Sequence, residues 1–402
     1  GKLTGTVAYS DTDSELPPTM LTQPAGETQR DRSLRSMLQW ERSLNGLGTL
    51  IARGAWIREH LHYRNQVASI DAPSRFDRFV GQVDLRRSKK SRALYVEAAG
   101  LRFFHDGVQN TNYQDGSARQ SLGSAFTQIS FFPHERLKSE LVLRQELLDG
   151  QLAPWMAFWG TNYRALDFLR IRLGLNKNAH APTLNDRFWV PGGNPDLLQE
   201  KSLGGELAFI FSRPDYGDWR WKVHVAGFLQ SVDNWIQWVP TTSNFWVSEN
   251  VRKVQASGIE SIVEFETQPG EWDFYVRLSH TWTRSRNMEA DSSLADIVGK
   301  QLIYVPEHRA AGRMGIGWKR FRLQYQHTFT GSRFLTRDNV DELPAFHVAD
   351  LILEKRFSLN KNTLAVQAGI ANIWDATYQN VVWRPMPGRN YYLRLEWEFL
   401  KR

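Results

Sequence analysis

The feature that most constrains this chain is an alternation of apolar and polar residues with a period of two. It is clearest in the closing stretch "GRNYYLRLEWEF". The apolar positions there are Tyr391, Leu393, Leu395, Trp397 and Phe399, and the positions between them are Tyr392, Arg394, Glu396 and Glu398. This period predicts a β-strand whose two faces meet different environments. Both a soluble sheet and a membrane barrel with a polar lumen satisfy it.

The same alternation recurs along the whole chain. "RLKSELVLRQEL" places Leu141 and Leu143 on one face and Arg144 on the other, and "FRLQYQHTF" separates Leu323 and Tyr325 from Arg322 and Gln324. No long helical period competes with these stretches. The pattern predicts an all-β protein with about eighteen strands. The opening "GKLTGTVAYS" is itself typical of a strand.

Composition narrows the class of protein. Of 402 residues, 41% are hydrophobic and 23% charged, which is typical of a folded chain. No apolar run is long enough for a transmembrane helix. The 16 tryptophans suit the aromatic girdles of a membrane barrel. There are no cysteines, which excludes disulfides and thiolate metal sites. The net charge of +7 is scattered rather than gathered in a stripe, so we expect no nucleic-acid partner.

The connections between strands are sorted by length. Short turns are expected near 43–46, 86–91, 133–135, 268–271 and 358–361. Long polar loops are expected at 11–32, 60–74, 104–119, 175–200, 233–257, 284–307, 331–344 and 372–389. Short and long connections alternate, with a shorter exception near 148–153. Outer-membrane barrels have this arrangement, with short periplasmic turns and long extracellular loops. The many charged residues on the lumen faces favour a wide barrel over a soluble one, which would have to bury them.

Two stretches resemble TonB-dependent outer-membrane receptors. "AHAPTLNDRFWVPGGNPDLLQEKS" (179–202) is similar to the family's seventh extracellular loop, in which an Ala-Pro-Thr box precedes Gly-Asn-Pro-Asp-Leu. "IANIWDATYQNVVWRPMPGRNYYLRLEWEF" (370–399) is similar to the family's ending, and its Arg-Pro-Met-Pro-Gly-Arg form resembles receptors of the Bacteroidetes. The similarity spans nearly the whole chain.

The resemblance implies a barrel of about 22 strands with an N-terminal plug, of which residues 1–402 form a C-terminal portion without the plug. It implies a bacterial outer-membrane receptor that imports a scarce solute with energy from a TonB-type periplasmic protein. The expected partners are membrane lipid, the plug with the first strands, this energiser and a surface lipoprotein. Cobalamin, a ferric siderophore or haem are the expected cargoes. An oligosaccharide or peptide receptor and a passive porin are alternatives.

Candidate ligand-binding residues lie in two of the long loops. They are His180, Asn185, Arg187, Trp189, Asn194, Asp196, Phe245 and Trp246. His180 resembles the histidine that haem receptors of the family use as an iron ligand, although a lone loop histidine is more often solvated. Trp235 and Trp238 fit either an aromatic ligand platform or the outer girdle.

The remaining signals concern metals, catalysis and assembly. Asp11, Asp13 and Glu15 could hold calcium, although a solvated acidic turn is commoner. No nucleophile–base pair or metal-ligand cluster is evident, so we expect neither an enzyme nor a cofactor. The last strand resembles the assembly signal of outer-membrane barrels. Its residues are Tyr391, Leu395, Trp397 and Phe399, with Phe399 as the terminal aromatic. Leu400, Lys401 and Arg402 follow it, a small departure from the usual ending.

Overall fold

The computed structural model consists almost entirely of β-strands. It describes residues 1–16, 26–67, 69–87, 94–213, 217–241, 245–289, 297–359 and 362–399. One antiparallel sheet of nineteen strands forms the body, and two two-stranded sheets lie in the connections. In the described part of the chain, no helix is long and apolar enough to cross a membrane.

Most strands are longer than those of a typical soluble sheet. The elements are β1 (Lys2–Glu15), β2 (Thr28–Leu44), β3 (Gly48–Asn65), β4 (Ile70–Arg86), β5 (Leu94–Asn110), β6 (Ser117–His134), β7 (Leu137–Leu148), β8 (Gln151–Leu152), β9 (Met156–Leu166), β10 (Leu169–His180), α1 (Leu184–Phe188), β11 (Glu200–Ser212), β12 (Trp219–Pro240), β13 (Trp246–Thr267), β14 (Trp272–Glu289), β15 (His308–Trp318), β16 (Phe321–Thr330), β17 (Arg333–Phe334), β18 (Glu342–Leu343), β19 (Phe346–Leu359), β20 (Asn362–Ala371), β21 (Gln379–Val381), β22 (Arg384–Pro385) and β23 (Asn390–Phe399).

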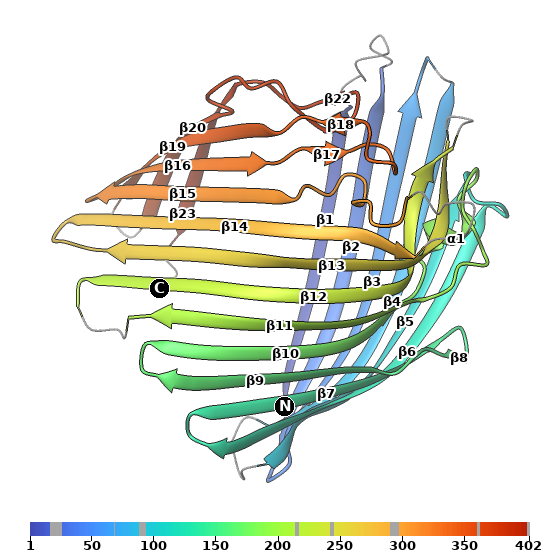
Figure 1. Ribbon diagram of the computed structural model, residues 1–402, viewed down its shortest axis with the longest axis horizontal. Coiled ribbons are helices and arrows are strands. Elements are labelled where there is room, and N and C mark those ends of the chain that lie inside the picture. The colour runs from blue at the N-terminus through green and yellow to red at the C-terminus, as the bar shows by residue number, and fades with distance from the viewer. Residues whose placement is uncertain are drawn as a thin grey trace.

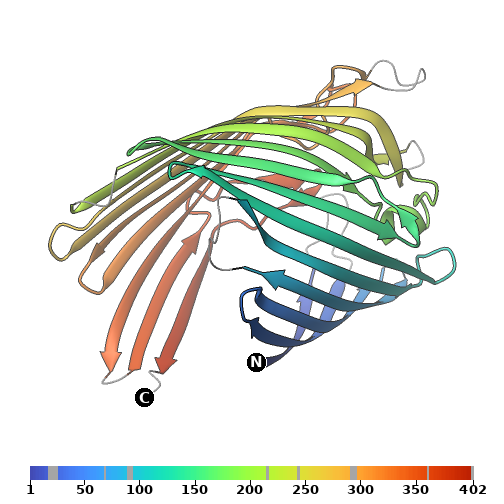
Figure 2. The same ribbon diagram turned by 90° about the horizontal axis from the view of Figure 1, so that it is seen from below.

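The main sheet follows the order of the chain. Each long strand pairs antiparallel with the next, and the ladder continues from β7 to β9, from β16 to β19 and from β20 to β23. Leaving out the two-residue β8, eighteen strands remain, which confirms the predicted all-β architecture and strand number. The sheet curves into an arch with β1 and β23 at its two ends (Figures 1 and 2). Among the described residues, β1 pairs with β2 alone and β23 with β20 alone.

The register separates an apolar face from a polar face. Leu323 lies opposite Leu353, and Leu395 lies opposite Val366. On the other face the Arg322 guanidinium lies 3.3 Å from the Asp273 carboxylate. Leu323 and Arg322, which the alternation predicts on opposite faces, therefore lie on opposite sides of the sheet.

Several connections are shorter than the sequence indicates. We expected a loop at 60–74, but β3 continues to Asn65 and β4 begins at Ile70. The expected loop at 233–257 is a hairpin, because β12 runs to Pro240 and β13 starts at Trp246. We had expected loops in these two segments only because their residues are mostly polar. Strands can carry polar residues on both faces once both faces meet water, because the backbone ladder continues to satisfy their amides. The expected loops at 331–344 and 372–389 are confirmed.

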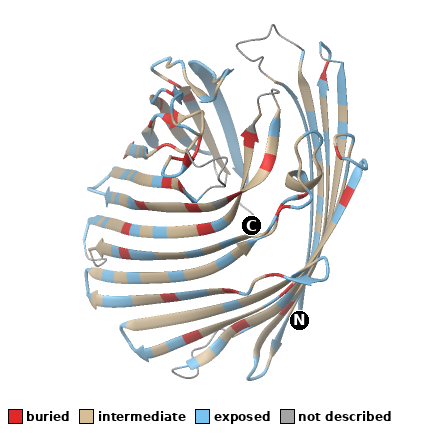
Figure 3. Cartoon of the chain, turned by 45° about the vertical axis from the view of Figure 1, so that its right-hand side comes forward, coloured by how far each residue is buried: buried red, intermediate tan, exposed pale blue. Residues whose placement is uncertain are grey.

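Buried apolar residues do not form a central core; they are divided between the strands of the sheet and the connections. The strands are mostly intermediate or exposed along their length (Figure 3). Buried apolar residues of the connections are Tyr113, Leu184, Leu197, Ile297, Leu302 and Ile303. A barrel wall has no interior of its own, so compact packing is available mainly where the loops meet. Both clusters of buried apolar residues, around Tyr113 and around Val254, include residues of the connections, so the loops pack as an ordered layer.

Aromatic rings form a girdle at the end of the sheet that carries the short turns. Trp272 stacks on Trp318 with ring centroids 5.8 Å apart, and Trp219 lies 6.4 Å from Phe265. These rings belong to the apolar face. Such a band marks a membrane–water interface, where amphipathic rings are favoured. The short-turn end thus lies at one boundary of the bilayer, and short turns are typical of the periplasmic side of outer-membrane barrels.

Candidate functional site

The connection between β10 and β11 is an ordered structure built around the helix α1. Pro182 is buried, and Thr183 is the N-cap of the helix. The Thr183 hydroxyl accepts a hydrogen bond from the Asp186 backbone amide at 3.1 Å, and the Asp186 carboxylate accepts one from the Thr183 amide at 2.9 Å. This is a reciprocal capping box, with Asp in the position usually held by Glu. The Ala-Pro-Thr box therefore starts a short helix.

One side of this loop is fixed to the connection between β5 and β6. Tyr113 packs in a buried cluster with Ala118 and Leu184, against which Phe188 and Trp189 also pack. The Tyr113 hydroxyl donates a hydrogen bond to the Asn185 side-chain oxygen. Burial, helped by the Asp186 carboxylate, raises the pKa of Tyr113 to about 12. The phenol is therefore neutral, and a donor, throughout the physiological range.

The other side of the loop is fixed to the β12–β13 hairpin. The Trp238 indole donates a hydrogen bond to the Asp186 carboxylate at 2.8 Å. The Ser248 amide donates to the Gly192 carbonyl at 2.8 Å. Gly192 has φ +110°, and a Cβ there would lie 1.9 Å from the Trp246 carbonyl oxygen. Only glycine permits this approach, so the Gly-Gly of the loop has a packing role.

The candidate residues are thus brought into one assembly, but with different exposure. Asn185 and Trp189 are engaged in the contacts to Tyr113. The Asn194 side-chain oxygen accepts from the Asp196 amide at 3.0 Å, so the Asn-Pro-Asp-Leu box folds on itself. Phe245 occupies the hairpin turn, where its carbonyl accepts from the Thr241 amide.

Four candidates keep side chains available to a ligand, and the exposed Asp196 is one of them. His180 is 62% exposed, and its Nδ1 lies 3.4 Å from a Glu200 carboxylate oxygen. Trp246 is 41% exposed beside the hairpin turn. Arg187 lies over the Phe188 ring and within 4.0 Å of the Asp149 carboxylate.

The alternative roles of the other tryptophans are also resolved by packing. Trp235 packs against the buried cluster of Val251, Val254 and Leu302, and Trp238 is engaged with Asp186. Both rings are engaged by residues of the loop layer, which favours a structural role over the outer girdle that the sequence also allowed. They act as structural members of the loop layer.

Asp11, Asp13 and Glu15 lie in β1 rather than in a turn. Both Asp11 carboxylate oxygens accept hydrogen bonds from Arg30, at 2.9 and 2.7 Å, and Arg32 lies 3.3 Å away. An arginine-paired carboxylate is poorly placed to bind calcium. Within the described ranges, no group of three or more metal-binding side chains is assembled anywhere.

A second part of the loop layer was not predicted from the sequence. Gln301 and Asn339 exchange hydrogen bonds of 2.7 and 2.9 Å between two loops. Arg337 forms an ion pair with Glu249 on β13. No local spacing signals these contacts, because each joins segments far apart in the chain. They extend the interlocked loops from β13 to the connection between β16 and β19.

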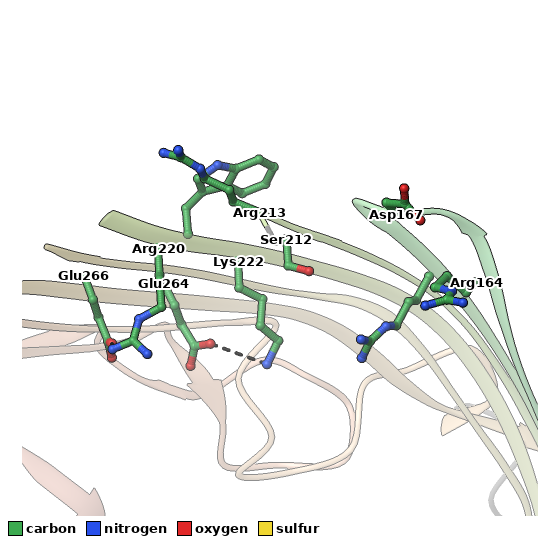
Figure 4. Close-up of a pocket in the computed structure, with 10 residues that line it drawn as sticks. Arg164, Asp167, Ser212, Arg213, Arg220, Lys222, Glu264 and Glu266 are labelled. Atoms are coloured by element: carbon green, nitrogen blue, oxygen red, sulfur yellow. Dashed lines mark hydrogen bonds and ion pairs between the residues drawn. The ribbon is translucent and has the colours of Figure 1, made fainter. Parts of the chain in front are cut away.

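The polar face of the sheet carries a charged pocket near the periplasmic turns. It has a volume of about 590 Å³ and is lined by residues of β9 to β13. Arg220, Lys222, Glu264 and Glu266 project to the same side of the wall (Figure 4). Lys222 lies 3.4 Å from Glu264, and Arg220 lies 3.2 Å from Glu266.

Arg164 and Arg170 line the same pocket, and Arg172 lies farther along the lumen face. For these three guanidinium groups the described residues supply no ion-pair partner. If a plug fills the lumen, Arg144, Arg170, Arg172, Arg322 and Arg394 are expected to take their carboxylate partners from outside these 402 residues. Three of them instead have partners in this chain. Arg144 lies 2.5 Å from Glu146 and Arg394 lies 4.0 Å from Glu396, each two residues along the same strand. Arg322 of β16 lies 3.3 Å from Asp273 of β14.

The predicted assembly residues all lie on the apolar face of β23. Tyr391, Leu395 and Phe399 are largely exposed, and Trp397 lies 6.1 Å from Phe399 between ring centroids. Their role in assembly stays a prediction. Leu400, Lys401 and Arg402 lie outside the described residues.

These features define a class: the wall of a bacterial outer-membrane barrel with a polar lumen and an ordered extracellular loop layer. The family model "TonB dependent receptor-like, beta-barrel" matches residues 2–373, and the chain belongs to this family. This is a family of receptors and not of enzymes, and it places the chain in the bacterial outer membrane.

Individual relatives are distant. The vitamin B12 transporter BtuB of Photobacterium profundum is 24% identical over 305 residues, which is 75% of this chain and 47% of that protein. The chain therefore spans about half the length of this relative. The Serratia marcescens hemophore receptor HasR, solved with its hemophore HasA and heme, gives a TM-score of 0.74 at 14% identity, over 97% of this chain and 68% of that one. The copper transporter OprC gives a TM-score of 0.75 at 14% identity, over 98% of this chain and 68% of that one.

Proposed function

We propose that this chain is the main wall and ligand-capturing loop layer of an energised outer-membrane importer. The observation that carries the proposal is the interlocking of the 181–199 loop with two other connections, through Tyr113 on one side and Trp238 on the other. Preorganised loops bind a dilute solute with less loss of conformational entropy than free loops do. A passive pore has no need of such a layer.

The free edges of the sheet support a larger assembly. Strand edges facing hydrocarbon leave backbone amides without partners, at a cost of several kcal/mol for each group. We propose that residues 1–402 are the C-terminal portion of a barrel whose remaining strands, about four, join β23 to β1. A plug inside the barrel would supply carboxylates to Arg164, Arg170 and Arg172. A TonB-type periplasmic protein would then move the plug and release the ligand.

The cargo that we favour is a cobalamin. The sequence similarity to a vitamin B12 transporter supports this choice, although the structural neighbours include a heme hemophore receptor and a copper transporter. Ferric siderophores and haem are the next candidates, and an oligosaccharide or peptide receptor follows them. A surface lipoprotein that covers the loop layer is a further proposed partner.

Binding of labelled cyanocobalamin to cells that express the complete receptor tests the cargo. We expect saturable binding that excess unlabelled cobalamin displaces and that haem or a ferric siderophore does not. Trp246→Ala should weaken binding, because this exposed indole lies at the edge of the loop layer. Trp272→Ala is the matched control, since its ring belongs to the periplasmic girdle. Displacement by haem alone would overturn the cobalamin proposal and leave the importer class in place.

A further inference from the structure

A groove runs along β15 on the apolar face of the sheet. Its floor is formed by Ala310 and Gly312, two small residues of β15. Leu278 of β14 and His327 of β16 lie on either side of Gly312, and the register places His280 beside Ala310. Met314 closes the lower end. The groove has a volume of about 500 Å³, within the range of small-molecule sites.

The position of the groove limits what can occupy it. Met314 pairs with Tyr325, and Leu323 follows on the same face. This face meets the bilayer, so a soluble ligand from the lumen has no access to it. An apolar furrow in a lipid-facing wall offers additional dispersion contacts to a hydrocarbon chain. The occupant is therefore an acyl chain.

Two histidine pairs lie at the extracellular end of the groove. His280 Nε2 lies 3.2 Å from His308 Nδ1, and the two rings stack with centroids 5.4 Å apart. His327 Nε2 lies 3.1 Å from His347 Nδ1. The Tyr325 hydroxyl lies 2.9 Å from the remaining nitrogen of His327. Four imidazoles on a membrane-facing surface are costly in hydrocarbon and suited to the level of the lipid headgroups.

Hydrogen-bond donors gather at this end of the groove. Imidazoles supply N–H donors and become cationic when protonated. Arg284, two residues beyond Trp282 on the same strand face, adds a guanidinium, with Glu307 at 3.8 Å as its ion-pair partner. Phosphate oxygens accept strong hydrogen bonds from both types of donor. The extracellular end thus fits a phosphate group.

We propose that this groove binds one acyl chain of a phosphorylated glycolipid of the outer leaflet, with a lipid phosphate against the two histidine pairs. The extracellular level of the histidines assigns the lipid to the outer leaflet. The site would hold the lipid as a fixed part of the receptor surface, below the loops that follow β14 and β16.

A second hollow on the same face makes a useful comparison. It is floored by Ala52, Gly54 and Gly81 and has a similar volume of about 500 Å³. Above it, Arg58 lies 2.7 Å from the Asp77 carboxylate, which Arg75 also contacts at 2.7 Å. There Asp77 accepts hydrogen bonds from both guanidinium groups, whereas the described residues supply no ion-pair partner to the two histidine pairs. The histidine-lined groove is therefore the preferred lipid site.

Native mass spectrometry of the intact receptor, extracted from its own outer membrane in a mild detergent, tests the proposal. The probes are bisphosphorylated lipid A, phosphatidylethanolamine and a neutral diacylglycerol. Ala310→Leu fills the floor of the groove and should lower lipid A retention by about tenfold or more. Ala368→Leu is the control, because Ala368 lies on the same face opposite Leu393 and away from the groove. Equal retention by the two variants would overturn the site.

A double variant, His280→Gln with His327→Gln, separates the phosphate contact from the acyl contact. It should weaken lipid A binding about tenfold and leave diacylglycerol binding unchanged. Equal loss of both lipids, or diacylglycerol binding as tight as lipid A in the unmodified receptor, would reject the phosphate contact. Tighter binding of phosphatidylethanolamine than of lipid A would reject the glycolipid. Heat-modifiable migration on gels verifies that each variant forms a barrel. If Ala310→Leu does not form one, Gly312→Ala replaces it as a milder change of the groove floor, because its Cβ would meet only the Leu278 side chain, at 3.2 Å.

Discussion

Trp238 donates a hydrogen bond from its indole nitrogen to the carboxylate of Asp186, across 52 residues of sequence and at a distance of 2.8 Å. The same carboxylate accepts from the Thr183 amide. A single aspartate therefore starts α1 and attaches it to the β12–β13 hairpin. The helix has five residues and could not persist alone, so its order depends on these contacts.

Replacing Asp186 by alanine should release the loop. Loss of the capping box and of the indole contact should cost about 1–3 kcal/mol of local order. We expect faster trypsin cleavage after Arg187 on intact cells and weaker ligand binding, with normal barrel assembly. For cleavage, the control is Asp196→Ala, whose exposed carboxylate forms no hydrogen bond or ion pair with the described residues. Equal cleavage of the two variants would show that the hydrogen bonds of Asp186 are not needed to order the loop.

Gly192→Ala should have a similar effect through the backbone. A Cβ at this position would overlap the Trp246 carbonyl oxygen, and φ +110° is itself unfavourable for alanine. The loop should move away from the hairpin, and ligand affinity should fall by at least about tenfold. Gly227→Ala provides the comparison, because a Cβ there meets no atom within 4 Å. Titration of ligand binding on both variants at matched surface abundance is the measurement.

The contact between Tyr113 and Asn185 should resist alkaline pH. Burial raises the pKa of Tyr113 to about 12, above its ordinary value of 10.0. Because the neutral phenol is favoured in the folded state, its contribution to stability is complete below pH 10 and is lost as the pH rises through about 12. The difference in phenolate absorbance between the unmodified protein and Tyr113→Phe should show one group titrating near 12. A midpoint near 10 would contradict the buried contact.

The two faces of β16 should respond differently to arginine. Leu323 lies opposite Ile316 and Leu353 on the apolar face, whereas the Gln324 side chain accepts a hydrogen bond from Tyr275 at 2.6 Å on the polar face. Arginine on the lipid face costs about 2–4 kcal/mol at the bilayer midplane and about 0–1 kcal/mol near the interfaces, and Leu323 lies two residues beyond Phe321 at the periplasmic end of β16. Leu323→Arg should therefore reduce the amount of heat-modifiable barrel in the outer membrane more than Gln324→Arg does. Equal amounts would contradict the assignment of faces.

The wall of the barrel could be predicted from the sequence, but most of the loop layer could not. Period-two alternation at positions such as 391–399 depends on local chemistry, and it correctly indicated both strands and faces. The polar ends of β3, β4, β12 and β13 were mistaken for loops, because polarity indicates water on a face and not the absence of a ladder. Contacts such as Trp238 with Asp186, or Gln301 with Asn339, join distant segments and have no local pattern. The histidine pairs likewise become visible only when β14 to β19 are placed in register.

The lumen arginines separate a gated importer from an open pore. Arg170 and Arg172 lie on the polar face of β10, and neither has an ion-pair partner in the described part of the chain, whereas Arg220 is paired with Glu266. If a plug carries their partners, the intact receptor should conduct almost no current across a planar bilayer and should open when the plug is deleted. Arg170→Glu with Arg172→Glu should raise the resting conductance by disturbing the seat of the plug, and Arg220→Glu should raise it less, because its charge is already satisfied within the wall. A large constitutive conductance from the intact protein would reject the importer and favour a passive porin.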